Sequence, residues 1–157
     1  MTTATQSNPA IARGIFRELV PATATKPGYM VFELPGSSYQ LHLIPAAEVD
    51  AIPGKRIRGI ITCKGRRVDQ MSPGGRFIEP LYGRPRRVQG VVIAINPDRN
   101  ALVVNAAGAI AVDGMALPIV VELTHPDQQA KDFAIGTMVG CDVMDGATFA
   151  PANEGVR

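Results

Sequence analysis

Short apolar runs separated by turn-forming residues are the feature of this chain that most constrains its fold. The runs "YMVFEL" (29–34) and "YQLHLI" (39–44) flank the connector "PGSS". Two such runs around a tight connector rich in proline, glycine and serine predict a β-hairpin. In the second run, apolar side chains alternate with Gln40 and His42. This period of two predicts one buried face and one wet face.

Further strands are predicted downstream by the same reasoning. The run "KRIRGIITCKGRR" has a period of two, which sends its apolar and its polar side chains to opposite faces. The apolar face holds Ile57, Ile61 and Cys63, and the basic face holds Arg56, Arg58, Thr62 and Lys64. Additional runs lie at 86–95, 101–112, 117–123 and 137–144. Asp113-Gly114 is typical of a type I′ hairpin turn, and Pro118 favours a strand start or an edge.

One short helix is expected at 124–136, where Thr124 suits the N-cap, Pro126 the first turn and Gly136 the end. From Arg56 to Met144 the chain then has five strands and one helix, which resembles the OB-fold in element count. The OB-fold has its helix between the third and fourth strands, whereas here the helix follows the fourth. The 29–44 hairpin is additional, and would add to the barrel or pack across an open end.

We therefore predict an all-β protein with a small closed or partly open β-barrel, OB-like at best, an N-terminal hairpin and one short helix. The 157 residues suit a single domain. We expect the barrel at 13–149, with flexible tails at 1–12 and 150–157.

The cysteines and the apolar runs predict the compartment. Cys63 and Cys141 each lie in an apolar stretch, which favours reduced core thiols in a cytosolic protein, with one buried disulfide as the alternative. The N-terminal residues lack the pattern of a secretory signal, and no apolar run approaches the roughly 20 residues needed to span a bilayer. We expect a cytoplasmic protein with no membrane contact.

Charge is distributed unevenly along the chain. Between Lys55 and Arg99 there are eleven basic residues and three acids, a balance of +8. The whole chain has 16 basic residues and 14 acids, so the remainder has five against eleven, or −6. Such a split predicts a polyanionic partner or a charged contact between subunits.

The connector "SPGGRFIEPLYGRPRR" (72–87) concentrates arginines around two aromatic rings. Guanidinium groups bind phosphate oxygens in a bidentate manner, and aromatic rings stack on unpaired bases. We predict a non-catalytic module that binds an extended polyanion, preferentially single-stranded nucleic acid, without choosing between DNA and RNA. The predicted contacts are Arg56, Arg58, Lys64, Arg66, Arg67, Arg76, Phe77, Tyr82, Arg84, Arg86 and Arg87.

Two alternatives remain for the same residues. In the first, the connector packs onto the barrel while its arginines are solvated or pair with acids of a neighbouring subunit. In the second, the protein is a homo-oligomeric scaffold, because Asn105 is the one polar side chain among the apolar residues 101–112. A second copy would then cover part of that strand, with a basic region meeting an acidic region across the contact.

No catalytic or metal-binding signature stands out. The four candidate metal ligands, His42, His125, Cys63 and Cys141, do not come in the close pairs that structural zinc sites use. The candidate acid–base pairs are Asp142 with Asp145 and Asp127 with Asp132, and sequence supplies neither the cleft nor the opposed environments that such pairs need. The glycine-rich stretches also lack the order of a P-loop. We predict that the protein is not an enzyme and has no cofactor.

Overall fold

The computed structural model describes residues 8–71, 75–107 and 116–152. Within these ranges the chain forms one twelve-stranded sheet and a single short 3-10 turn, which confirms the predicted all-β class. In chain order, the elements are β1 (Ile11–Val20), β2 (Tyr29–Glu33), β3 (Gln40–Pro45), β4 (Arg56–Gly65), β5 (Asp69–Gln70), β6 (Phe77–Glu79), β7 (Tyr82–Gly83), β8 (Arg87–Asn96), β9 (Ala101–Asn105), β10 (Pro118–Leu123), η3 (Ala130–Asp132), β11 (Met138–Asp142) and β12 (Thr148–Pro151).

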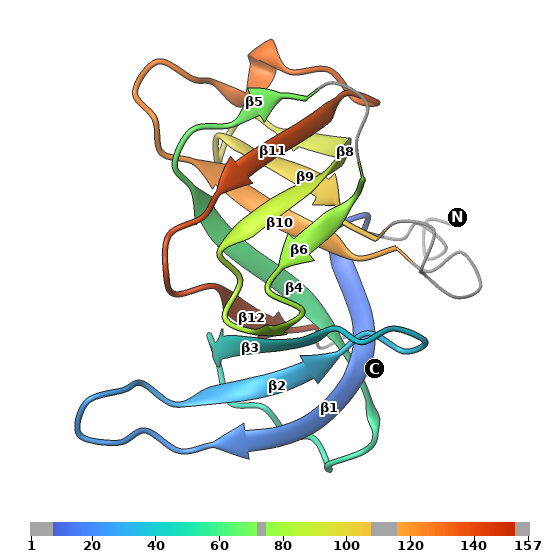
Figure 1. Ribbon diagram of the computed structural model, residues 1–157, viewed down its shortest axis with the longest axis vertical. Helices are drawn as coiled ribbons and strands as arrows, with labels where there is room; N and C mark the ends of the chain where they lie inside the picture. The colour runs from blue at the N-terminus through green and yellow to red at the C-terminus, as the bar shows by residue number, and fades with distance from the viewer. Residues whose placement is uncertain (1–7, 72–74, 108–115, 153–157) are drawn as a thin grey trace.

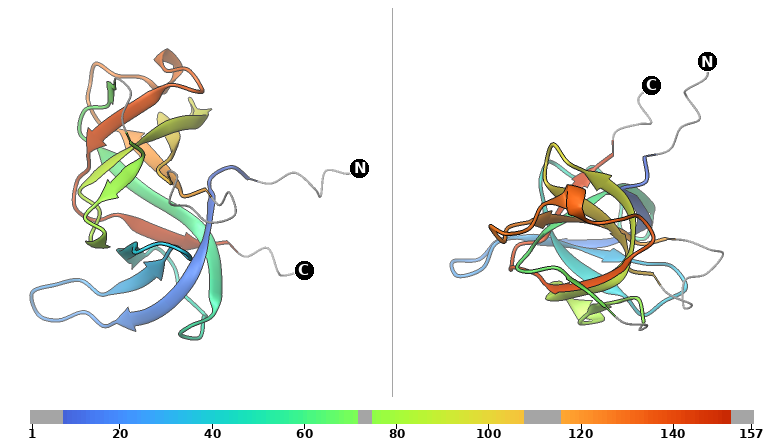
Figure 2. Two further views of the ribbon diagram at one scale, coloured as in Figure 1. Left: turned by 45° about the vertical axis from the view of Figure 1, so that its right-hand side comes forward. Right: turned by 90° about the horizontal axis from the view of Figure 1, so that it is seen from above.

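The strand pairings close two rings that share β4, the long strand that runs through both halves of the molecule (Figure 1). The N-terminal barrel has the ring order β1-β2-β3-β12-β4, and β4 pairs again with β1. The C-terminal barrel has the order β4-β10-β9-β8-β11. A bridge between Gly65 and Val143 closes this second ring, and the N–H of Arg66 donates to the carbonyl of Asp142 at 2.9 Å beside it. Figure 2 shows the two barrels from two further directions.

Both barrels have the strand connectivity of the OB-fold. In the N-terminal barrel, β3 and β12 pair in parallel and the other neighbours are antiparallel, so the ring order in chain numbering is 1-2-3-5-4. In the C-terminal barrel, β4 and β10 form the parallel pair, and the ring runs β8-β9-β10-β4-β11. If β8, β9, β10, β11 and β4 are numbered 1 to 5, this ring also has the order 1-2-3-5-4. Counted in this way, η3 lies between the third and fourth strands. The apparent misplacement of the helix therefore reflects a permuted barrel.

The 29–44 hairpin forms as predicted, but it is not an addition to a single barrel. It supplies β2 and β3 of the N-terminal barrel, and the strands that complete the ring, β1 and β12, were missed. β1 begins at Ile11 and buries Ala12, and β12 includes Ala150, so both strands extend into segments expected to be tails. The apolar residues of β1 come in adjacent pairs, at 11–12, 15–16 and 19–20, so a search for a period of two does not find the strand. A register shift between Phe16 and Glu18 adds to the irregularity.

The predicted helix at 124–136 is reduced to the three residues of η3. Thr124 does not cap it, because its hydroxyl donates to the carbonyl of Gly65 at 2.7 Å. Pro118 begins β10, as predicted, while the Asp113-Gly114 turn lies outside the described residues. Within the described ranges, the structure has no helix with the length and apolar content that crossing a bilayer requires.

Apolar side chains of the two barrels form one continuous core, which includes Phe32 and Phe149 in the N-terminal barrel and Leu102 and Val121 in the C-terminal barrel. The outward-facing side chains of β9 and β10 form a second small cluster with Ala10. Both faces of β9 are thus buried within one chain, so the apolar pattern of residues 101–105 does not require cover from a second copy. Residues 108–112 of the predicted strand lie outside the described residues.

Cys63 and Cys141 are buried and free, which confirms the prediction of core thiols. Burial raises the pKa of both thiols. The pKa of Cys63 lies well above its usual value, and that of Cys141 rises to about 12.

Candidate functional site

The connector from β6 to β8 joins the two barrels. β6 pairs with β8 in the C-terminal barrel, and β7 pairs in parallel with β3 in the N-terminal barrel. The N–H of Gln40 donates to the carbonyl of Leu81 at 2.8 Å, and the N–H of Ile78 donates to the hydroxyl of Tyr39 at 3.1 Å. These bonds fix the connector across the junction of the barrels, while residues 72–74 of the predicted segment lie outside the described residues.

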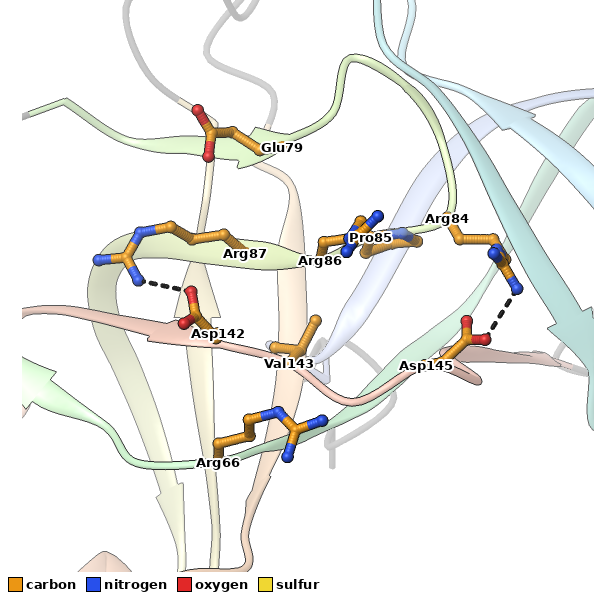
Figure 3. A pocket seen from close by; sticks show the side chains of 9 residues that line it. All are labelled: Arg66, Glu79, Arg84, Pro85, Arg86, Arg87, Asp142, Val143 and Asp145. Carbon is orange, nitrogen blue, oxygen red and sulfur yellow. Dashed lines mark hydrogen bonds and ion pairs between the residues drawn. The ribbon is translucent and has the colours of Figure 1, made fainter.

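A pocket of about 500 Å³, here called the arginine pocket, lies where this connector meets the closing seam of the C-terminal barrel (Figure 3). Arg66 follows β4, Arg84 and Arg86 precede β8, and Arg87 begins β8. The pocket is lined by Arg66, Glu79, Arg84, Pro85, Arg86, Arg87, Asp142, Val143 and Asp145. Four arginines face three carboxylates, so the lining carries a formal charge of +1.

Two of these arginines pair with carboxylates of the same chain, as the dashed lines in Figure 3 show. The Nη1 atom of Arg84 lies 2.7 Å from Asp145, and that of Arg87 lies 3.0 Å from Asp142. Arg66 and Arg86 are exposed, and neither forms an ion pair within the described ranges. The pocket therefore presents two solvated guanidinium groups to an incoming anion.

A second pocket of about 370 Å³, here called the aromatic pocket, lies beside the first in the N-terminal barrel. Its lining comes from the β1–β2 loop, from β2 and β3, from the connector before β8, and from the loop before β12. The residues are Lys26, Pro27, Tyr29, His42, Ile44, Arg84, Asp145, Gly146 and Ala147. Arg84 and Asp145 line both pockets, so the two form neighbouring parts of one site.

Aromatic rings make up one wall of the aromatic pocket. The ring of Tyr29 stacks on His42 with a centroid distance of 4.4 Å and an angle of 17°. The ring of Tyr82 lies at an angle of 75° to His42, with a centroid distance of 4.9 Å. Burial lowers the pKa of His42, Arg84 lowers it further, and Glu18 opposes both effects. The Nε2 atom of His42 is buried without a hydrogen-bond partner among the described residues.

The structure brings together part of the predicted contact set. Arg66, Arg84, Arg86 and Arg87 line the arginine pocket, and Tyr82 contacts His42 beside it. The remaining predicted residues line neither pocket; these are Arg56, Arg58, Lys64, Arg67, Arg76 and Phe77. The ten extended residues of β4 span roughly 30 Å, so Arg56 and Arg58 at its start lie far from Lys64 near its end. The basic face of β4 therefore does not converge on one point.

The charge split of the sequence is partly neutralised within the molecule. Arg84, Arg87 and Arg99 lie in the basic segment, and each pairs with an acid outside it. Arg67 pairs with Asp69 at 3.2 Å inside the segment. Since folding places β8, β10 and β11 in one barrel, the charges that the sequence separates become neighbours.

Lys26, Tyr29 and His42 line the aromatic pocket but were not among the predicted contact residues. The alternation of residues 39–44 placed His42 on the face opposite the core, and this was the one indication in the sequence that His42 is accessible to a ligand. Sequence gave no sign that Tyr29 stacks on this face or that the β1–β2 loop and β7 partly cover it.

No family model, curated protein or solved structure matches this chain. Within the part of the chain that the structure describes, no three His, Cys, Asp or Glu side chains gather in a group that could hold a metal ion.

Proposed function

We propose that the protein binds single-stranded nucleic acid, without catalysis, at the junction of its two barrels. Strand phosphates contact the arginine pocket, and bases lie toward the aromatic rings. The observation that carries this proposal is the sharing of Arg84 and Asp145 by the two pockets, because it places cationic and aromatic side chains side by side.

The chemistry of the two pockets favours a single strand over a duplex. The guanidinium groups of Arg66 and Arg86 suit phosphate oxygens. Aromatic faces bind bases only when the bases are unpaired. OB-type barrels bind oligonucleotides across their second and third strands and adjacent loops. In the N-terminal barrel these strands are β2 and β3, which carry Tyr29 and His42. This likeness is an analogy of fold and supports the proposal only alongside the pocket chemistry.

The test is fluorescence anisotropy with a labelled mixed-sequence oligonucleotide across a series of salt concentrations. We expect affinity to fall steeply as salt rises, because each phosphate contact on a single strand contributes about −0.7 to the slope of log K against log salt. In the Arg66→Ala/Arg86→Ala double variant, we expect roughly tenfold weaker binding and a slope shallower by about 1.4.

The matched control is the Arg13→Ala/Arg56→Ala double variant, which removes two exposed arginines that line neither pocket. It should bind as the wild type does. An equal loss in both double variants would point to diffuse surface charge and overturn the assignment to the arginine pocket. Failure of the wild type to bind at low salt would overturn the function. Light scattering on the wild type and on an Arg84→Ala/Arg86→Ala/Arg87→Ala variant tests the alternative scaffold prediction, in which these changes break apart an oligomer.

A further inference from the structure

We infer that the aromatic pocket is a base subsite, which takes one unpaired nucleobase of the strand whose phosphates contact the arginine pocket. This inference rests on the proposed function and deepens it. It gives a specific role to Lys26, Tyr29 and His42, which lie outside the basic segment that first indicated nucleic acid.

The walls of the aromatic pocket suit a planar heterocycle. Tyr29 and His42 already form a parallel stack with a centroid distance of 4.4 Å. Pro27, Ile44 and Ala147 supply apolar surface around it. Planar rings bind such a wall by stacking and by the release of apolar surface from water.

The rim of the pocket suits the phosphates that a nucleotide carries. Lys26 lies on the β1–β2 loop and is exposed, and Arg84 lines the same pocket from the connector. Arg84 also lines the arginine pocket, so a phosphate held there lies between the base subsite and the next phosphate site. This placement makes the aromatic pocket part of a strand-binding track.

His42 gives the subsite a polar group that the protein itself does not use. Its Nε2 atom is buried and has no hydrogen-bond partner within the described ranges. A buried polar atom without a partner is unfavourable, and a ring nitrogen or exocyclic group of a base would supply one. Tyr82 is 62% exposed, and its ring lies beside that of His42 without lining the pocket. We expect this side chain to shift when a base reaches Nε2.

Two eight-nucleotide strands separate base binding from phosphate binding. One is oligothymidine, and the other carries the same phosphates on abasic residues throughout. We expect the wild-type protein to bind oligothymidine about 5- to 150-fold more tightly, the range that one stacked base contributes. In Tyr29→Leu and His42→Leu variants, this preference should fall toward unity, while the affinity for the abasic strand stays at the wild-type value.

Control variants distinguish loss of the subsite from loss of the fold. Tyr29→Phe keeps the ring and should keep the preference for bases. Phe133→Leu changes a partly buried aromatic residue outside both pockets and should also keep it. If the wild type bound the two strands equally, the base subsite would be overturned while the proposed function would stand. This result does not depend on whether any variant folds. Unchanged base preference in Tyr29→Leu and His42→Leu would place the stacked base elsewhere. Binding of neither strand would overturn the proposed function as well.

Discussion

The guanidinium group of Arg84 lies 2.7 Å from the carboxylate of Asp145, and this pair stands between the arginine pocket and the aromatic pocket. Both side chains are more than half exposed. Solvent therefore screens the ion pair, and breaking it costs little free energy. A phosphate that binds Arg84 has to compete with Asp145. The protein thus carries an internal competitor inside its proposed strand-binding track.

Removal of this competitor should strengthen binding. The Asp145→Asn change keeps the shape of the side chain and its fit to the turn before Gly146, while it frees Arg84. Because an exposed ion pair contributes roughly 0.2–1 kcal/mol, we expect affinity for single-stranded DNA to rise about 1.4- to 5-fold at low salt. Anisotropy titrations measure the change directly.

Asp69→Asn is the matched control for that change. It also removes one negative charge and frees an exposed arginine, Arg67, which lines neither pocket. We expect little change in affinity. Equal gains in both variants would show that net charge, and not Arg84, governs binding.

Gly59 lies in β4 where β1 and β12 both pair with it. A methyl group at this position would collide with the carbonyl oxygen of Ala150 and lie 2.5 Å from the ring of Phe149. We expect Gly59→Ala to lower the free energy of unfolding by about 1–3 kcal/mol through overpacking, measured by urea denaturation. Gly75→Ala, whose new methyl would lie 3.8 Å from Phe77, should change it by less than about 0.5 kcal/mol. Equal effects would contradict the shared-strand packing.

Stability should depend on pH through His42. Its pKa in the folded protein lies below the ordinary value of 6.5, chiefly because of burial. Between these two values the unfolded chain binds more protons than the folded chain, so acid favours unfolding. The contribution of His42 is therefore present above about pH 6.5 and is lost as pH falls toward the lowered value. Urea denaturation from pH 7.5 to 5 should show a smaller decline in His42→Gln than in the wild type. Identical pH profiles would contradict this account.

The two thiols should be unreactive in the native protein. Cys63 and Cys141 are buried, and their raised pKa values keep both protonated at neutral pH. Since the thiolate is the reactive form, we expect a thiol-specific colour reagent at pH 8 to modify neither cysteine until denaturant is added, when both react. Rapid labelling of one cysteine without denaturant would show that the barrel seam opens locally.

The sequence by itself determined the local elements. The hairpin of β2 and β3, the two faces of β4 and the strand start at Pro118 follow from side-chain alternation and turn residues, which act over a few positions. These signals also placed the prediction in the all-β class. These signals did not reveal β1, because its apolar residues come in adjacent pairs and do not alternate with polar ones.

The tertiary structure alone decided how the strands close and what the site contains. β4 pairs with β1, β10 and β12, which lie far from it in the chain, and these pairings make it the shared strand of two barrels. The same closure places Asp142 beside Arg87. It also brings Arg66 into the pocket that Arg84 and Arg86 line. Such contacts depend on which strands meet across the rings, and no local pattern of residues encodes that choice.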